Sequence, residues 1–265
     1  MIILITGITS GFGRAMAARL CADGHRVYGT HRRETDRIPG VTYIKADVCD
    51  SGSIQSAVSQ VLDAEGHIDV FISNAGMGIG GPLEFTSMAD AERQMDTNFM
   101  GMVRALKCVI PGMRQRGSGQ IICFSSIAGR MGLPYQGMYS ASKFAIEGYC
   151  ESLRLELRGS GVHVTVIEPG DFATAFTASR SKVSREEAAL AYPAYPKAME
   201  SAENDERTGL KPEYLAVRIS RIVTKTHPAN RYVIATFVQK MSIVLKTILP
   251  PKLFDRILAS YYSGF

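Results

Sequence analysis

The glycine-rich turn near the start of the chain restricts the fold more than any other stretch. Before it, Ile2–Thr6 is a short apolar run that ends at Gly7, a pattern typical of a strand buried in a parallel sheet. After it, three alanines and Leu20 predict a helix over Gly13–Asp23. A buried strand that passes through glycines into a helix is how folds of alternating strands and helices begin.

Strands and helices are predicted to alternate in the same way along the rest of the chain. The further expected strands are short apolar runs at Arg26–Thr30, Thr42–Ala46, Asp69–Ser73, Gln120–Phe124, Val162–Glu168 and Arg231–Ala235. The expected helices cover residues 53–65, 87–97, 99–116, 139–158 and 212–226. This order predicts an α/β fold: a single domain with a doubly wound parallel sheet of about seven strands and helices on both faces.

Sheets of this kind bind ligands beyond the carboxyl ends of their strands, where the strand order reverses. Several polar or small residues follow predicted strand ends and are therefore expected to meet in one crevice. They are Gly7, Arg32, Asp47, Asn74, Ser126 and Pro169.

The composition of the chain bears on its binding partners and on the cell compartment in which it folds. The net charge is only +5 and no basic block is interleaved with aromatic residues, so we expect no nucleic-acid partner. The 5 cysteines fall singly, without a C-x-x-C motif, which argues against a metal site and a disulfide framework and suits a reducing compartment. The chain has no signal peptide pattern and no apolar run of about 18 residues, so we expect a cytoplasmic protein without a membrane span.

Residues 125–143 contain side chains suited to proton transfer. Tyr139 and Lys143 stand at i and i+4 of a predicted helix and so share one face. A nearby ammonium stabilises a phenolate, so we expect Lys143 to lower the pKa of Tyr139 and make it a general acid/base. Taken alone, this spacing favours the alternative of an amphipathic helix with a tyrosine at its rim and a solvated lysine; the motifs that accompany it support the catalytic interpretation.

The glycine-rich turn fits a diphosphate group. Glycines let the backbone approach the ligand, and a helix N-terminus offers free N–H groups and the positive end of a dipole. The alternative is a plain tight turn, but the position between a buried strand and a helix favours dinucleotide binding. The expected cofactor contacts in the turn are Gly7, Thr9, Ser10, Gly11, Phe12 and Gly13.

The glycines follow the pattern G-x-x-x-G-x-G. Together with Asn74-Ala75-Gly76, Ser126, Tyr139-x-x-x-Lys143 and Pro169-Gly170, in that order, this pattern resembles the classical short-chain dehydrogenase/reductase family over about residues 2 to 236. The C-terminal extension and the Gly-Leu-Pro-Tyr segment look most like the 17β-hydroxysteroid and retinol dehydrogenase branches. The resemblance implies a Rossmann-like fold, a nicotinamide cofactor and a homodimer or homotetramer.

The resemblance also implies the roles of the site residues. Tyr139 is the general acid/base, Lys143 binds the nicotinamide ribose and lowers the pKa of the phenol, and Ser126 hydrogen-bonds the substrate oxygen. Asn98 matches a helix asparagine that holds a water linking Lys143 to solvent; alternatively it bonds its own backbone. No metal and no covalent intermediate are expected, because the cofactor supplies the hydride.

The residues after the second strand bear on the choice of cofactor. An acid there would bind the ribose 2′-hydroxyl of NAD, but the strand ends Gly29-Thr30-His31-Arg32-Arg33, with no acid until Glu34. Arg32, alone or with Arg33, can instead bind a 2′-phosphate, and Ser10 can add a hydroxyl. We therefore expect NADP(H) in preference to NAD(H). The other expected cofactor contacts are Asp47, Val48, Asn74, Ala75, Gly76, Tyr139, Lys143, Pro169, Gly170, Phe172 and Thr174.

Residues 171–210 correspond to the family's substrate lid, and their apolar and aromatic side chains suggest a lipophilic substrate, although they could equally pack down as a surface helix. The expected substrate contacts are Ser126, Leu133, Tyr135, Tyr139 and Phe176.

Residues 1–236 form the dinucleotide-binding and catalytic part. Residues 237–265 form an apolar extension of the same domain that could lie on a membrane, cover the pocket or pack on a partner.

These observations predict an NADP(H)-dependent oxidoreductase that interconverts an alcohol and a ketone or aldehyde on a steroid-, retinoid- or lipid-like substrate. One alternative is a 3-oxoacyl thioester reductase, which the long tail disfavours. The other alternative is a sensor or scaffold that binds NADP(H) without turnover. This alternative is disfavoured by the presence of Ser126, Tyr139 and Lys143.

Overall fold

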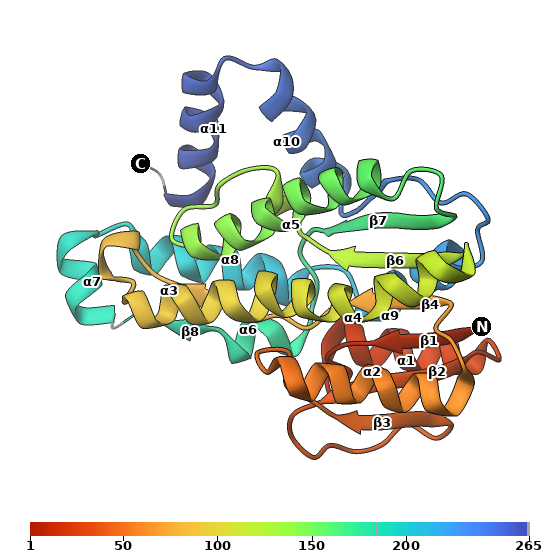
Figure 1. The fold of residues 1–265 in the computed structure, drawn as a ribbon. Coiled ribbons are helices and arrows are strands. Elements are labelled where there is room, and N and C mark those ends of the chain that lie inside the picture. Colours follow the sequence, from red (N-terminus) through yellow and green to blue (C-terminus); the bar gives the residue numbers. More distant parts are fainter. Residues whose placement is uncertain (184, 264–265) are drawn as a thin grey trace.

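The protein is described by a computed structural model that covers residues 1–183 and 185–263 (Figure 1). Ser184 in the expected lid, and Gly264 and Phe265 at the end of the expected extension, lie outside the described residues. The centre of the molecule is one parallel sheet with the strand order β3-β2-β1-β4-β6-β7-β9. Its strands are β1 (Ile2–Ile5), β2 (Arg26–His31), β3 (Val41–Lys45), β4 (Val70–Ser73), β6 (Gly119–Phe124), β7 (Val162–Pro169) and β9 (Arg231–Ile234).

Helices cover both faces of this sheet, as expected (Figure 1). One face carries α1 (Gly11–Ala22) and α9 (Pro212–Val223), and the other carries α2 (Ser51–Glu65), α4 (Gly101–Arg116) and α5 (Gly137–Glu156). Successive residues of β1 point to opposite faces, so Ile3 and Ile5 pack under α1 and α9, whereas Leu4 packs under the other three helices. Burial on both faces explains why the strand is apolar at every position.

The strand order reverses between β1 and β4, which are hydrogen-bonded neighbours in the sheet although two strands separate them in sequence. The α/β fold class with a doubly wound parallel sheet is therefore confirmed. The helices predicted at 87–97 and 99–116 are α3 (Met88–Met95) and α4, joined by a π-helical turn at Asp96–Met100.

The expected lid is more structured than the sequence suggested. It contains α6 (Ala175–Ser179), α7 (Arg185–Ala191) and the longer α8 (Tyr195–Thr208), and the short strand β8 (Ser181–Lys182) pairs with β5 (Ile79–Gly80). The buried aromatic ring of Tyr195 anchors this region.

The C-terminal residues form two helices, α10 (Phe237–Ile248) and α11 (Pro251–Ser263), seen as the blue hairpin in Figure 1. Ile243 and Phe254 from these helices are buried in a cluster with Ile127, Met131 and Ala235. The extension therefore packs on the domain, and α11 also contacts α8. Within residues 1–183 and 185–263, no helix combines the length and the apolar character that a membrane span needs.

Two glycines bring the first loop close to the start of α1. A Cβ on Gly13 would lie 2.0 Å from the carbonyl oxygen of Gly7, which itself has a positive φ of 74°. Residue 13 therefore has to be glycine for the loop to keep this path.

We expect Gly13→Ala to lower the free energy of unfolding by about 1–3 kcal/mol, because the added methyl group overpacks the loop. Gly112→Ala is the control: this helical position has nothing within 4 Å of the added Cβ, so the change should raise stability by about 0.5–1 kcal/mol. Urea unfolding measures both. Equal effects of the two substitutions would contradict the role assigned to Gly13.

Candidate active site

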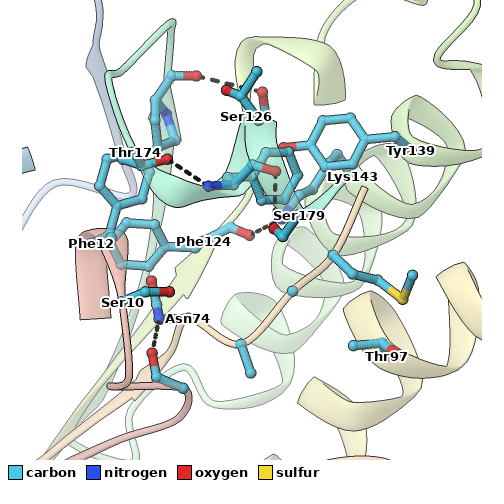
Figure 2. A pocket seen from close by; sticks show the side chains of 18 of the residues that line it. Ser10, Phe12, Asn74, Thr97, Phe124, Ser126, Tyr139, Lys143, Thr174 and Ser179 are labelled. Atoms are coloured by element: carbon cyan, nitrogen blue, oxygen red, sulfur yellow. Dashed lines mark hydrogen bonds between the residues drawn. The ribbon is translucent and has the colours of Figure 1, made fainter. Parts of the chain in front are cut away.

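A cavity of about 1140 Å³ runs along the carboxyl ends of the central strands. The glycine loop between β1 and α1 forms one end, and residues of α8 and α11 line the other. Figure 2 shows Ser10, Phe12 and Asn74 at the loop end, with Ser126, Tyr139 and Lys143 gathered farther along the cavity.

Most of the residues predicted from the sequence line this cavity. Of the predicted cofactor contacts, those that line the cavity are Gly7, Thr9, Ser10, Gly11, Phe12, Arg32, Asp47, Val48, Asn74, Ala75, Gly76, Tyr139, Lys143, Pro169, Gly170, Phe172 and Thr174. Of the predicted substrate contacts, those that line the cavity are Ser126, Leu133, Tyr139 and Phe176.

Three predicted residues are not among the lining residues. Gly13 lies beneath the loop and supports it through its contact with Gly7. Tyr135 was expected to touch substrate, but its ring packs on Tyr192 and Tyr195 in the lid, with a positive φ of 59°. That expectation is wrong for the side chain, because the left-handed backbone at residue 135 turns it into the aromatic cluster.

Asn98 is the third residue, and it lies one layer behind the cavity in the π-helical turn. Its Oδ1 accepts from the Met77 amide at 2.8 Å, and its Nδ2 donates to the Met77 carbonyl at 3.0 Å and to Ser142 Oγ at 3.1 Å. The Ser142 hydroxyl in turn donates to the Tyr139 carbonyl at 2.7 Å. Asn98 therefore joins the loop after β4 to the helix that carries Tyr139, and the alternative of bonds within its own helix is wrong.

The glycine loop is fixed to the end of β4. The Asn74 amide Nδ2 donates to the carbonyls of Thr6 and Gly7 at 3.0 and 2.9 Å, and Thr6 Oγ1 accepts from the amides of Asn74 and Ala75. Ser10, the N-cap of α1, makes no side-chain cap, so the N–H groups of the first turn stay available to a ligand. A close-packed glycine cradle with open helix amides fits the diphosphate of a dinucleotide.

The rim near β2 carries positive charge. Arg32 and Arg33 both line the cavity, and Arg32 Nη1 lies 3.7 Å from Asp47 Oδ2. Both partners of this ion pair are well exposed, so the pair is loose and its net stabilisation small. Arg32 can therefore turn toward a ligand.

Lys143 is a buried ammonium near the centre of the cavity. Only 6% of the residue is exposed, and its Nζ donates to the Phe124 carbonyl at 2.9 Å. The same nitrogen lies 5.5 Å from the centre of the Tyr139 ring, so the two side chains share one helix face as the i, i+4 spacing predicted. Burial lowers the pKa of Lys143 to about 8.

The pKa of Tyr139 differs from the expectation. Burial, together with the charges of Glu206 and Asp171, raises it to about 12, although hydrogen bonding to Ser126 and the charge of Arg180 act in the opposite direction. The expected lowering by Lys143 is wrong for this structure, because desolvation of the phenol outweighs the nearby charges. The phenol is therefore protonated at neutral pH.

Ser126 follows the end of β6 and lies within hydrogen-bonding reach of the Tyr139 hydroxyl. Its Oγ accepts from the Ala128 amide at 3.1 Å and lies 3.5 Å from the Pro169 carbonyl, to which it donates. These two contacts restrict the hydroxyl, and Figure 2 shows Ser126 and Tyr139 in the same part of the cavity.

Sequence reasoning missed the acidic and aromatic residues at the far end of the cavity, Asp171, Asp205, Glu206 and Tyr262. Asp171 follows β7 directly, so the same strand-end rule that selected Pro169 could have found it. Nothing in the local pattern of α8 or α11 marks the other three.

Comparison with known proteins agrees with this architecture. The family model described as short chain dehydrogenase matches residues 1–185. Over 264 residues the chain is 42% identical to a 3-ketodihydrosphingosine reductase of Bacteroides thetaiotaomicron, covering 99% of this chain and 98% of that protein. Human 17-beta-hydroxysteroid dehydrogenase type 1 is 40% identical over 191 residues, 66% of this chain and 58% of that protein.

Among solved structures, a short-chain dehydrogenase from Streptomyces avermitilis superposes with a TM-score of 0.78 at 27% identity, covering 98% of this chain and 94% of that one. The protein thus has the nucleotide-binding Rossmann fold of an oxidoreductase. It belongs to the short-chain dehydrogenase family, which confirms the predicted resemblance.

The raised pKa of Asp171 predicts a pH-dependent stability. Burial and the charges of Glu206 and Asp205 raise this pKa from 3.8 to about 7. The folded chain therefore binds this proton more tightly than the unfolded chain, and stability is lost as the pH rises from about 4 to about 7. Asp171→Asn removes the charge and keeps an acceptor for Gln239.

We expect Asp171→Asn to be more stable than the parent at pH 8, on the order of 1–3 kcal/mol after screening by solvent, and to lose this advantage near pH 4. Urea unfolding at both pH values measures the difference. Asp63→Asn, an exposed position on α2, is the control and should change little. A pH-independent difference for Asp171→Asn would show that its charge is not the cause.

Proposed function

We propose that this protein is an NADP(H)-dependent oxidoreductase that interconverts an alcohol and a ketone or aldehyde on a lipophilic substrate. The observation that carries the proposal is the meeting of Ser126, Tyr139 and Lys143 in the cavity that begins at the glycine loop. Of the steroid-, retinoid- and lipid-like substrates that the family resemblance implies, the full-length similarity to a 3-ketodihydrosphingosine reductase favours a long-chain keto lipid.

The proposed proton transfer runs from the Tyr139 hydroxyl to the substrate oxygen during reduction, while Ser126 holds that oxygen in place. The nicotinamide cofactor supplies the hydride when it is bound. Lys143 holds the helix against the Phe124 carbonyl and places a positive charge beside the phenol. With a pKa of about 12, Tyr139 is protonated at neutral pH, which is the form that can donate a proton to a carbonyl oxygen.

We expect Tyr139→Phe to lower carbonyl reduction by about 10²-fold or more, because the ring stays and only the proton donor is lost. Binding of NADPH, followed by its fluorescence, should stay within severalfold of the parent. Tyr149→Phe makes the same change elsewhere on α5 and is the control. If the parent protein binds NADPH but reduces no ketone in a broad panel, the alternative of a non-catalytic sensor or scaffold is correct.

NADP(H) is the proposed cofactor because the rim after β2 offers Arg32 and Arg33 and no acid. The loose pair between Arg32 and Asp47 leaves the guanidinium free to bind a 2′-phosphate with charge-assisted hydrogen bonds.

We expect Arg32→Ala to raise the KM for NADPH about tenfold and to leave the KM for NADH nearly unchanged, since only NADPH carries the 2′-phosphate. Steady-state kinetics with each cofactor measure the two values. Arg19→Ala, which removes an exposed arginine of α1, is the control. An equal loss with both cofactors would contradict the assignment.

The 3-oxoacyl thioester alternative is less favoured by the acids at the substrate end. Asp171, Asp205 and Glu206 line that end, and they would repel the phosphates of a thioester carrier. An acetoacetyl thioester assay separates the two substrate classes.

We also propose a cytoplasmic homodimer or homotetramer. The five cysteines are unpaired, as suits a reducing compartment. Phe237, Val238 and Ile248 remain exposed on α10, where a partner subunit or a membrane surface could cover them.

A further inference from the structure

Three carboxylates from distant parts of the sequence meet at the substrate end of the cavity. Asp171 follows β7, whereas Asp205 and Glu206 lie near the end of α8, and all three line the cavity. The charges of Glu206 and Asp171 act on the Tyr139 hydroxyl. The acids therefore lie beside the position where the proposed function places the reacting carbonyl.

The three carboxylates carry more negative charge than the cations paired with them neutralise. Among the described residues, the cation that pairs with the group is Arg180, which forms an ion pair with Glu206. Asp171 Oδ2 accepts from the neutral Gln239 amide at 2.5 Å, and Asp205 Oδ2 accepts from the Tyr261 hydroxyl at 2.9 Å. Two carboxylates thus face the cavity without a cationic partner, and their mutual repulsion contributes to the raised pKa of Asp171.

Arg180 provides a second, independent observation. Its side chain is 1% exposed, and its Nε and Nη1 find no hydrogen-bond acceptor within the described residues. Its guanidinium lies behind Glu206, and its charge reaches both Tyr139 and Asp171. Arg180 is not among the residues that line the cavity, so it balances Glu206 from behind and leaves the charges of Asp171 and Asp205 to a cation from the cavity side.

A ligand that carries an ammonium group supplies the missing cation to the carboxylates that line the cavity. We propose that Asp171, Asp205 and Glu206, backed by Arg180, form a subsite for an ammonium group next to the reacting carbonyl, so that the substrate is a long-chain amino ketone. This inference rests on the proposed function and names its substrate class. A ligand ammonium there makes charge-assisted hydrogen bonds in a partly desolvated site, where they are strong.

The rest of the cavity suits the chain of such a substrate. Phe176 and Leu133 line it beside Tyr139, whose ring lies 5.7 Å from that of Phe176. The compound in the name of the Bacteroides relative is itself a ketone derived from a long-chain amino alcohol.

The test compares two ketones of equal chain length, one with a free amino group on the carbon beside the carbonyl and one with hydrogen there. For the parent protein with NADPH, we expect kcat/KM to be about tenfold or more higher for the amino ketone. Asp171→Asn should lower this ratio about fivefold or more, mainly through KM of the amino ketone. Asp63→Asn, remote from the cavity, should keep the parent ratio.

A second measurement is independent of turnover. We expect dodecylamine to bind the NADPH complex of the parent protein about tenfold or more tightly than dodecanol, and Asp171→Asn to remove most of this preference. If amine and alcohol bind equally and both ketones are reduced equally well, the ammonium subsite is wrong while the proposed function stands. If the amine preference is present but neither ketone is reduced, the subsite stands and the proposed function is wrong.

Discussion

Two hydrogen bonds from the Asn74 amide to the carbonyls of Thr6 and Gly7 hold the glycine loop at the end of β1 against the end of β4. These strands are the neighbours at which the strand order reverses, so the contact forms the floor of the cavity. The path of the loop also needs Gly13, because any side chain there would meet the Gly7 carbonyl. The shape of the loop end of the cavity follows from this close contact.

Burial then decides the chemistry of the central side chains. Lys143 and Tyr139 are both desolvated, which favours the neutral form of each and brings their pKa values to about 8 and about 12. The protein therefore keeps a protonated phenol at neutral pH, the form required to donate a proton to a carbonyl oxygen. Asn98 lies behind this pair and joins the segment at Met77 to α5, so it supports the geometry without lining the cavity.

Three carboxylates gather at the far end of the cavity. The lid helix α8 brings Asp205 and Glu206 to Asp171, and the C-terminal helices fasten the same place through Gln239 and Tyr261. Three carboxylates that share one buried arginine, Arg180, leave an excess of negative charge that is costly in the isolated protein. Such a cost is offset when a ligand of complementary charge binds, which is the physical basis for assigning an amino ketone.

The sequence by itself determined the alternation of strands and helices, the glycine loop and the shared helix face of Tyr139 and Lys143, because these depend on local periodicity and spacing. It also predicted that residues after strand ends, such as Asn74 and Ser126, would meet, since parallel strands end at one edge. Only the tertiary structure decided that Tyr135 turns into the lid and that the pKa of Tyr139 rises. It alone brought Asp205, Glu206 and Tyr262 to the cavity, because desolvation and charge balance depend on contacts between segments far apart in the chain.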